Sequence, residues 1–161
     1  MASATQRLSR ELRDAQRAAA ERGSERREIE LSLDEEEGGE ANLFRWRADI
    51  EGPRDSVYAG HRFILAFAVP PNYPLQPPKA RCVTTIFHPN IHFKTGEICL
   101  DILKAQWSPA WTLDSVCRAV INLLAYPEPD SPLNCDAGNL LRAGDTRGFR
   151  SMATFYLETA T

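Results

Sequence analysis

The chain has 161 residues, of which 43% are apolar and 25% are charged, and its formal net charge at pH 7 is −3. This length and composition fit one globular domain, which we expect to span residues 1–161. The acidic balance argues against nucleic-acid binding, which usually needs a basic face. The longest apolar run, residues 63–71, is far shorter than a bilayer span, and the N-terminus lacks the apolar stretch of a signal peptide. We therefore expect no direct membrane insertion and a location in the cytosol or nucleus, unless a partner tethers the protein elsewhere.

The N-terminal residues predict a basic amphipathic helix. Residues 1–27 hold seven Arg and four acidic residues, whereas residues 28–40 hold seven acidic residues and no basic one. The arginines are either a solvated helix face or a docking surface for an acidic partner. The helix is expected over residues 3–22, where apolar residues recur at helical spacing. These residues are Leu8, Leu12, Ala15 and Ala19.

Four segments in the first half of the chain predict strands. In the first three, apolar residues occupy every second position. A proline-rich stretch, residues 70–78, ends the third. Successive short strands joined by loops favour an antiparallel meander. The strands are expected over residues 29–33, 44–50, 63–69 and 80–86.

Three helices are predicted for the last third of the chain. The first begins after Thr112, a suitable capping residue, and runs to about Tyr126. Shorter helices are expected over residues 136–143 and 145–158. An N-terminal helix, four strands, a long loop and C-terminal helices describe an α+β fold. The last helix is expected to bury three large side chains, Phe149, Met152 and Tyr156.

Between the strands and these helices, residues 87–111 show no period and carry many turn residues. They predict a long loop, and loops of this length are usually functional. The loop contains Cys99, one of four cysteines. A cysteine on a loop can act as a nucleophile presented to a partner, although a lone cysteine is more often a small buried apolar residue. In a reducing compartment all four thiols are expected to be free, with Cys82 and Cys117 in the core and Cys135 left open.

A zinc site is the second chemistry that these residue types allow. Its ligands would be Cys82, His88, His92 and Cys99. Their spacing lacks the closely spaced cysteine pair of common structural sites. We therefore expect no metal.

Three motifs follow one another in the loop: His88-Pro89-Asn90, Ile98-Cys99-Leu100-Asp101-Ile102-Leu103 and Trp107-Ser108-Pro109-Ala110. In this order they closely resemble the catalytic segment of ubiquitin-conjugating enzymes. Residues 73–79 also resemble the family's Tyr-Pro-x-x-Pro-Pro loop, and residues 58–60 its Tyr-x-Gly turn. The resemblance covers roughly residues 3–158, and several motifs in the right order are far more specific than one short pattern. It implies the ubiquitin-conjugating fold.

The resemblance implies a catalytic role for four residues. Cys99 would accept ubiquitin from the activating enzyme as a thioester and pass it to a substrate. Asn90 would stabilise the oxyanion that forms when an amine attacks, or hold the loop, or both. Asp101 and Ser131 would lie near the thioester, and many relatives carry Asp where this chain has Ser131.

Two further residues would shape the site without reacting. The resemblance makes His88 and Pro89 structural, and it implies that the amine is desolvated and oriented rather than deprotonated by a separate general base. The segment from Asn90 to Cys99 is one residue longer than in many members of the family. The separation of these two groups is therefore expected to depend on how the fold accommodates the extra residue.

The resemblance also implies partners. A RING-type ligase would bind Leu75 together with Ser108, Pro109 and Ala110. The activating enzyme would contact Arg7 and Arg10 on the first helix. That enzyme, rather than this chain, would use ATP, so no cofactor is expected.

Residues 131–145 resemble the peroxisomal members of the family, which are peroxins. This implies a peripheral location on the cytosolic face of the peroxisome, a membrane-anchored peroxin partner and import receptors as substrates. A cell-cycle member shares the Ser-Pro-Leu-Asn of residues 131–134, so a non-peroxisomal conjugating enzyme remains an alternative. A catalytically silent scaffold of the same fold would lack the active cysteine. A cysteine hydrolase would need a paired base for Cys99, such as His88.

Overall fold

Four helices surround a four-stranded sheet in the structure, a computed structural model that describes residues 3–21, 23, 27–35, 39 and 41–160. The first helix precedes the strands, and the other three follow a long loop that contains the short 3-10 helix η1 (Asp101–Leu103). The helices are α1 (Ala4–Glu21), α2 (Leu113–Ala125), α3 (Cys135–Arg142) and α4 (Thr146–Thr159). The strands are β1 (Ile29–Leu33), β2 (Arg45–Glu51), β3 (Arg62–Ala68) and β4 (Lys79–Cys82).

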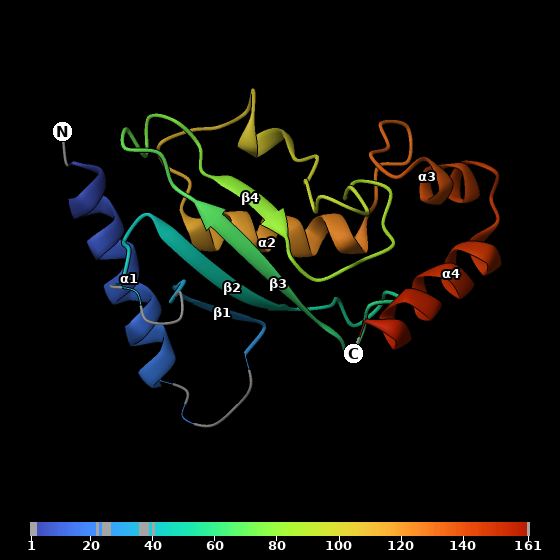
Figure 1. Ribbon diagram of the computed structural model, residues 1–161, viewed down its shortest axis with the longest axis horizontal. Helices are drawn as coiled ribbons and strands as arrows, with labels where there is room; N and C mark the ends of the chain where they lie inside the picture. Colours follow the sequence, from blue (N-terminus) through green and yellow to red (C-terminus); the bar gives the residue numbers. More distant parts are fainter. Residues whose placement is uncertain (1–2, 22, 24–26, 36–38, 40, 161) are drawn as a thin grey trace.

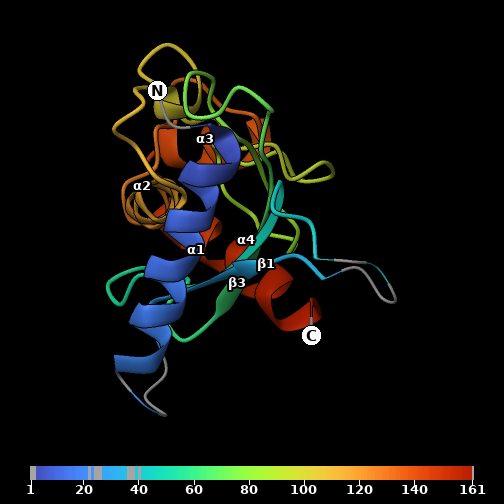
Figure 2. The ribbon, with the colours of Figure 1, turned by 90° about the vertical axis from the view of Figure 1, so that its left-hand side faces the viewer.

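The sheet is an antiparallel meander in the order β1-β2-β3-β4. Helix α2 lies across one face of it, α1 lies beside β1, and α3 and α4 lie at the opposite end (Figure 1). Figure 2 shows α2 nearly end-on, beside α1. The predicted α+β fold is confirmed. None of the helices within the described ranges combines the length and the apolar character needed to cross a membrane.

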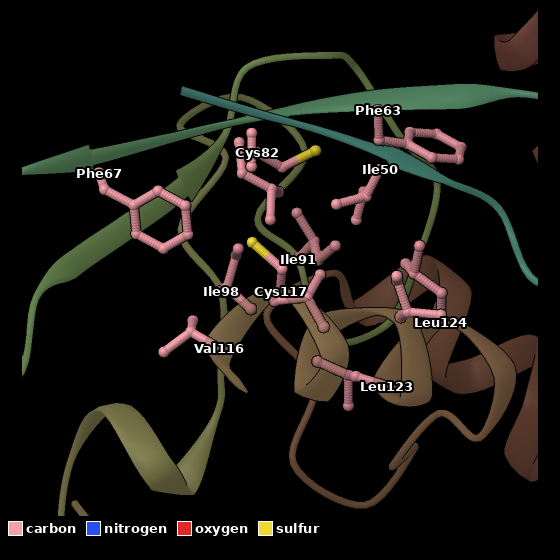
Figure 3. Packing of buried hydrophobic residues seen from close by; sticks show 14 of the residues in the cluster. Ile50, Phe63, Phe67, Cys82, Ile91, Ile98, Val116, Cys117, Leu123 and Leu124 are labelled. Carbon is pink, nitrogen blue, oxygen red and sulfur yellow. The ribbon is translucent and has the colours of Figure 1, made fainter. Parts of the chain in front are cut away.

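Alternation along β2 and β3 builds the core. Trp46, Phe63 and Phe67 are each at most 2% exposed. Figure 3 shows the strand side chains pointing toward α2, whose buried face they meet. Each large side chain buried in this way stabilises the fold by roughly 1.5–3 kcal/mol. The thiols of Cys82 and Cys117 lie in the same core, as predicted.

The fourth strand is shorter than predicted, because it ends at Cys82 rather than at residue 86. The Val83 amide still donates to the Ile64 carbonyl at 2.7 Å. The Ile64 amide, however, donates to the Thr84 hydroxyl at 2.8 Å, so a side chain replaces the next backbone acceptor. The chain then leaves the sheet, although Ile86 remains buried.

The prediction for the last helix was partly wrong. Met152 is 38% exposed, whereas the small Ala153 is buried together with Leu157. Phe149 and Tyr156 are half-buried and pack against Phe87. The α4 face that meets the core is therefore rotated from the one that the large side chains indicated.

Helix α1 carries a buried carboxylate that the helical pattern does not predict. The Oε1 atom of Glu11 accepts from Arg7 Nε at 2.8 Å and from the Tyr73 hydroxyl at 2.6 Å. Its Oε2 atom accepts from the Leu113 amide at 2.9 Å, at the start of α2. One side chain thus joins α1, the proline-rich loop and α2.

We expect the Glu11→Gln substitution to lower the free energy of unfolding by about 2 kcal/mol, because its amide nitrogen would face a donor instead of accepting from it. The matched control Glu21→Gln changes an exposed carboxylate at the end of the same helix and should stay within about 0.5 kcal/mol of the unmodified protein. Urea denaturation of both variants measures the difference. Equal effects would contradict a stabilising role for Glu11.

Candidate active site

His88 is the fully buried centre of the loop that precedes Cys99. Its Nδ1 accepts from the Asn90 amide at 3.0 Å, so the ring proton is on Nε2, which donates to the Leu123 carbonyl of α2 at 3.0 Å. Burial lowers the pKa of His88 to about 4, although the bond to Leu123 acts in the opposite direction. His88 is therefore a neutral residue that ties the loop to α2.

Pro89 and Asn90 join the segment after α2 to this turn. The Pro89 carbonyl accepts from the amides of Leu133 and Asn134, at 2.8 and 3.1 Å. The Asn90 side chain donates through Nδ2 to the Glu128 carbonyl and accepts through Oδ1 from the Glu128 amide, both at 2.8 Å. We call this reciprocal pair the Asn90–Glu128 clasp. It engages Oδ1 and one Nδ2 hydrogen of Asn90, and it supports the loop-holding role.

Cys99 pairs directly with Asn90 despite the long segment between them. The Cys99 amide donates to the Asn90 carbonyl at 2.9 Å, and Gly96 closes the intervening hairpin. Gly96 has φ +74°, and a Cβ atom there would lie 2.0 Å from the Cys82 carbonyl oxygen. The turn can follow this path because only glycine combines that φ with so close an approach.

A groove brings the four predicted catalytic residues together. Its lining includes Asn90, Cys99, Asp101 and Ser131. The groove also has a wall formed where α2 ends, to which the sequence analysis did not assign Asn122 or Tyr126. That wall includes Asn122, Tyr126 and Glu128.

The groove distinguishes Cys99 from the other cysteines. Burial raises the pKa of the Cys82 thiol to about 12 and also raises that of Cys117, so both stay protonated. Cys135 is exposed at the start of α3, but it does not line the groove. Cys99, which is half-buried, is the one cysteine in the described part of the chain that lines the groove.

The predicted ligase-binding residues come together on a different surface. Leu75 is 55% exposed on the proline-rich loop. The loop that precedes α2 contacts the residue before Leu75, because Trp107 Nε1 donates to the Pro74 carbonyl at 2.8 Å. The loop that precedes α2 also carries Ser108, which is half-buried, and Pro109 and Ala110, which are exposed.

The two predicted contacts for the activating enzyme differ in their surroundings. Arg10 is exposed on α1. Arg7 donates to the carbonyls of Pro109 and Trp111, at 3.0 and 2.8 Å, in addition to its bond with Glu11. Its guanidinium is therefore already bound within the chain.

Neither the zinc nor the hydrolase alternative gains support. No group of three or more His, Cys, Asp or Glu among the residues described is arranged to hold a metal ion. Both ring nitrogens of His88 already bond to the backbone, so the ring has no free position to take a proton from Cys99.

Several residues that build the site have no separate sequence signal. Tyr58 belongs to the Tyr-x-Gly turn, but its role emerges from the fold: its buried hydroxyl donates to the Phe87 carbonyl at 2.6 Å, one residue before His88. Glu128 contributes backbone atoms to the clasp, which any residue type could supply. Pro127 and Pro129, which flank Glu128, are the sequence signal that could have indicated a rigid segment along the groove.

Because the pKa of His88 is lower in the folded state than its ordinary value of 6.5, His88 should destabilise the fold as the pH falls. The contribution of the neutral His88 ring to the free energy of unfolding is complete above about pH 6.5. It is lost between about pH 6.5 and pH 4, because in this range only the unfolded chain binds the proton. The loss should approach roughly 3 kcal/mol. Urea denaturation between pH 7 and 4.5 measures this slope.

The variant His88→Gln should show a shallower decline over the same pH range, whatever its stability at pH 7. His61→Gln is the matched control, because it makes the same substitution at a half-buried histidine outside the loop that precedes Cys99. A His88→Gln slope equal to that of the unmodified protein would contradict this account.

Comparisons with known proteins identify the family to which this chain belongs. The family described as "Ubiquitin-conjugating enzyme" matches residues 7–157. Protein PEROXIN-4 of Arabidopsis thaliana is 67% identical over 121 residues, which cover 75% of this chain and 77% of that protein. The ubiquitin-conjugating enzyme E2 pex4 of Dictyostelium discoideum is 62% identical over 117 residues, covering 73% and 78%.

A solved structure extends the comparison to the whole fold. The H. polymorpha ubiquitin conjugating enzyme Pex4p, solved in complex with the soluble domain of Pex22p, has a TM-score of 0.81 and 37% identity. The match covers 95% of this chain and 97% of that one. The predicted resemblance is confirmed at the level of sequence and of fold: this chain belongs to the ubiquitin-conjugating enzymes, and it is similar to their peroxisomal members.

Proposed function

We propose that Cys99 carries ubiquitin as a thioester and that this single domain, residues 1–161, transfers it to peroxisomal import receptors. The observation that carries the proposal is the position of Cys99, a half-buried thiol that lines the groove. Cys82 and Cys117 are buried and stay protonated, and Cys135 does not line the groove. A thiolate is a strong nucleophile, and a thioester remains reactive toward amines and thiols.

The groove supports transfer without a general base. The Cys99 sulfur would first attack the thioester on the activating enzyme, whose thiol leaves. The acceptor would then attack the new thioester carbonyl, and the Cys99 thiolate leaves. Asn90 would hold the wall of the groove through the Asn90–Glu128 clasp. A second role toward the oxyanion would use the Nδ2 hydrogen that only the weak 3.5 Å contact with the Ser131 carbonyl engages.

Asp101 and Ser131 would contact the acceptor, because both are exposed and line the groove beside Cys99. Leu75, Ser108, Pro109 and Ala110 would bind a RING-type ligase as one surface. The activating enzyme would bind α1 through Arg10, with Arg7 shaping the adjacent loop. The chain would need no cofactor, since ATP is consumed by the activating enzyme.

The peroxisomal part of the proposal rests on the relatives. Two are named as peroxin 4, and the H. polymorpha structure is a complex with the soluble domain of Pex22p. We infer that a corresponding membrane-anchored peroxin holds this chain on the cytosolic face of the peroxisome. A cell-cycle conjugating enzyme is the alternative.

Incubation with ubiquitin, the activating enzyme and ATP should yield an adduct on a non-reducing gel that a thiol reductant removes. Cys99→Ala should abolish it completely, because no second thiol lines the groove in the described part of the chain. Cys135→Ala, which removes the other accessible thiol, should charge normally. A reducible adduct that survives Cys99→Ala, or disappears with Cys135→Ala, would contradict the assignment.

A reconstituted transfer tests the substrate. The charged protein, a RING-type ligase and the soluble domain of the partner peroxin should together modify an import receptor, and omission of the peroxin domain should reduce the yield. Thiol reductant then divides the product into cysteine-linked and lysine-linked ubiquitin. Equal transfer to a cell-cycle substrate with its own ligase, with none to the receptor, would favour the alternative.

A further inference from the structure

Tyr126 is an exposed aromatic residue at the edge of the groove. Its side chain is 73% exposed, the largest fraction of any large apolar residue in the described part of the chain. It lines the same groove as Cys99 and Asn90. Within that part of the chain the ring packs on no other aromatic ring and the hydroxyl forms no hydrogen bond. An aromatic ring this exposed adds little to the core and remains available to a ligand.

The backbone that carries the ring is nevertheless firmly anchored. The Tyr126 amide donates to the Asn122 carbonyl at 2.9 Å and so continues the last turn of α2. Pro127 follows, which restricts the backbone. Two residues after Tyr126, the Asn90–Glu128 clasp attaches the chain to the turn whose carbonyl binds the Cys99 amide. The ring is thus presented by anchored backbone on both sides.

The charges around Tyr126 have one sign. Asp101 and Glu128 are both exposed and both line the groove, and no Lys or Arg is among the lining residues that the structure describes. The face of an aromatic ring attracts cations, and neighbouring carboxylates add to that attraction. The combination fits an ammonium or guanidinium group and disfavours an acidic side chain.

We propose that Tyr126, together with Asp101 and Glu128, is a specificity-determining residue that binds a cationic side chain next to the reacting acceptor. The proposal rests on the Cys99 thioester described above. The cation comes from a Lys or Arg that flanks the acceptor residue in the substrate; the same chemistry could be supplied by the ubiquitin that Cys99 carries. Tyr126 takes no part in bond formation. It selects the acceptor by binding a side chain that neighbours the acceptor residue.

The test uses protein that has first been charged with ubiquitin, so that a failure of the Cys99 assignment is seen before any acceptor is added. Two acceptor peptides are compared, identical except for Arg or Gln beside the acceptor lysine. Discharge is followed at several peptide concentrations to give the ratio of kcat/KM for the two peptides. The unmodified protein should favour the Arg peptide, and the preference should weaken as salt is raised.

Tyr126→Leu, which keeps an apolar side chain but removes the ring, should lower this ratio by about two- to five-fold, through KM rather than kcat. Tyr126→Phe keeps the ring face and should preserve the ratio. Phe155→Leu is the matched control, because Phe155 is an exposed aromatic residue on α4 outside the groove. Its ratio should equal that of the unmodified protein.

The two sources of the cation give different results. If the substrate supplies the cation, Tyr126→Leu changes the ratio of kcat/KM between the two peptides. The rate of charging then equals that of the unmodified protein. If ubiquitin supplies it, Tyr126→Leu slows charging and lowers discharge of both peptides equally, which overturns the substrate assignment. A ratio that is the same in Tyr126→Leu, Phe155→Leu and the unmodified protein, with charging also unchanged, overturns the cation site itself.

Discussion

The buried turn formed by His88, Pro89 and Asn90 is the constraint on which the rest of the site depends. Each residue connects it to a different part of the chain: His88 to α2, the Pro89 carbonyl to residues 133 and 134, and Asn90 to both Cys99 and Glu128. Buried polar groups are costly unless they are paired, and here almost every one has a partner. The shape of the groove therefore depends on these hydrogen bonds, most of which involve backbone atoms rather than the reacting side chains.

A second buried polar centre, Glu11, organises the opposite end of the molecule. It joins α1, the proline-rich loop and the start of α2, while Arg7 extends the network to the loop that precedes α2. The two surfaces proposed for the activating enzyme and the ligase therefore share one rigid support. Such pre-organisation reduces the entropy lost when a partner binds. A buried carboxylate thus supports both of the proposed binding surfaces from inside the fold.

Between these two centres, the chemistry of the groove is simple. It contains one half-buried thiol, an amide already engaged in the clasp, and carboxylates near an exposed ring. The nearby imidazole of His88 is unsuited to act as a base toward Cys99, since both of its ring nitrogens already bond to the backbone. In the proposed transfer the rate would depend on how the acceptor is placed, and the lining of the groove would set the selectivity. In that proposal the anchored wall that follows α2 contributes to function together with Cys99.

The sequence by itself determined the α+β fold, the element order, the family and the short list of candidate residues, because apolar periodicity and ordered motifs are local signals. Only the tertiary structure decided which residues meet. The backbone of Glu128 in the clasp and the buried carboxylate of Glu11 are invisible to patterns, since their bonds cross 38 and 102 positions of the chain. The early end of β4 and the exposure of Met152 were missed for a related reason: a Thr84 hydroxyl displaces a strand bond, and a small Ala153 takes the buried position. Periodicity predicts which residues can face the core, whereas long-range packing and hydrogen bonding select the ones that do.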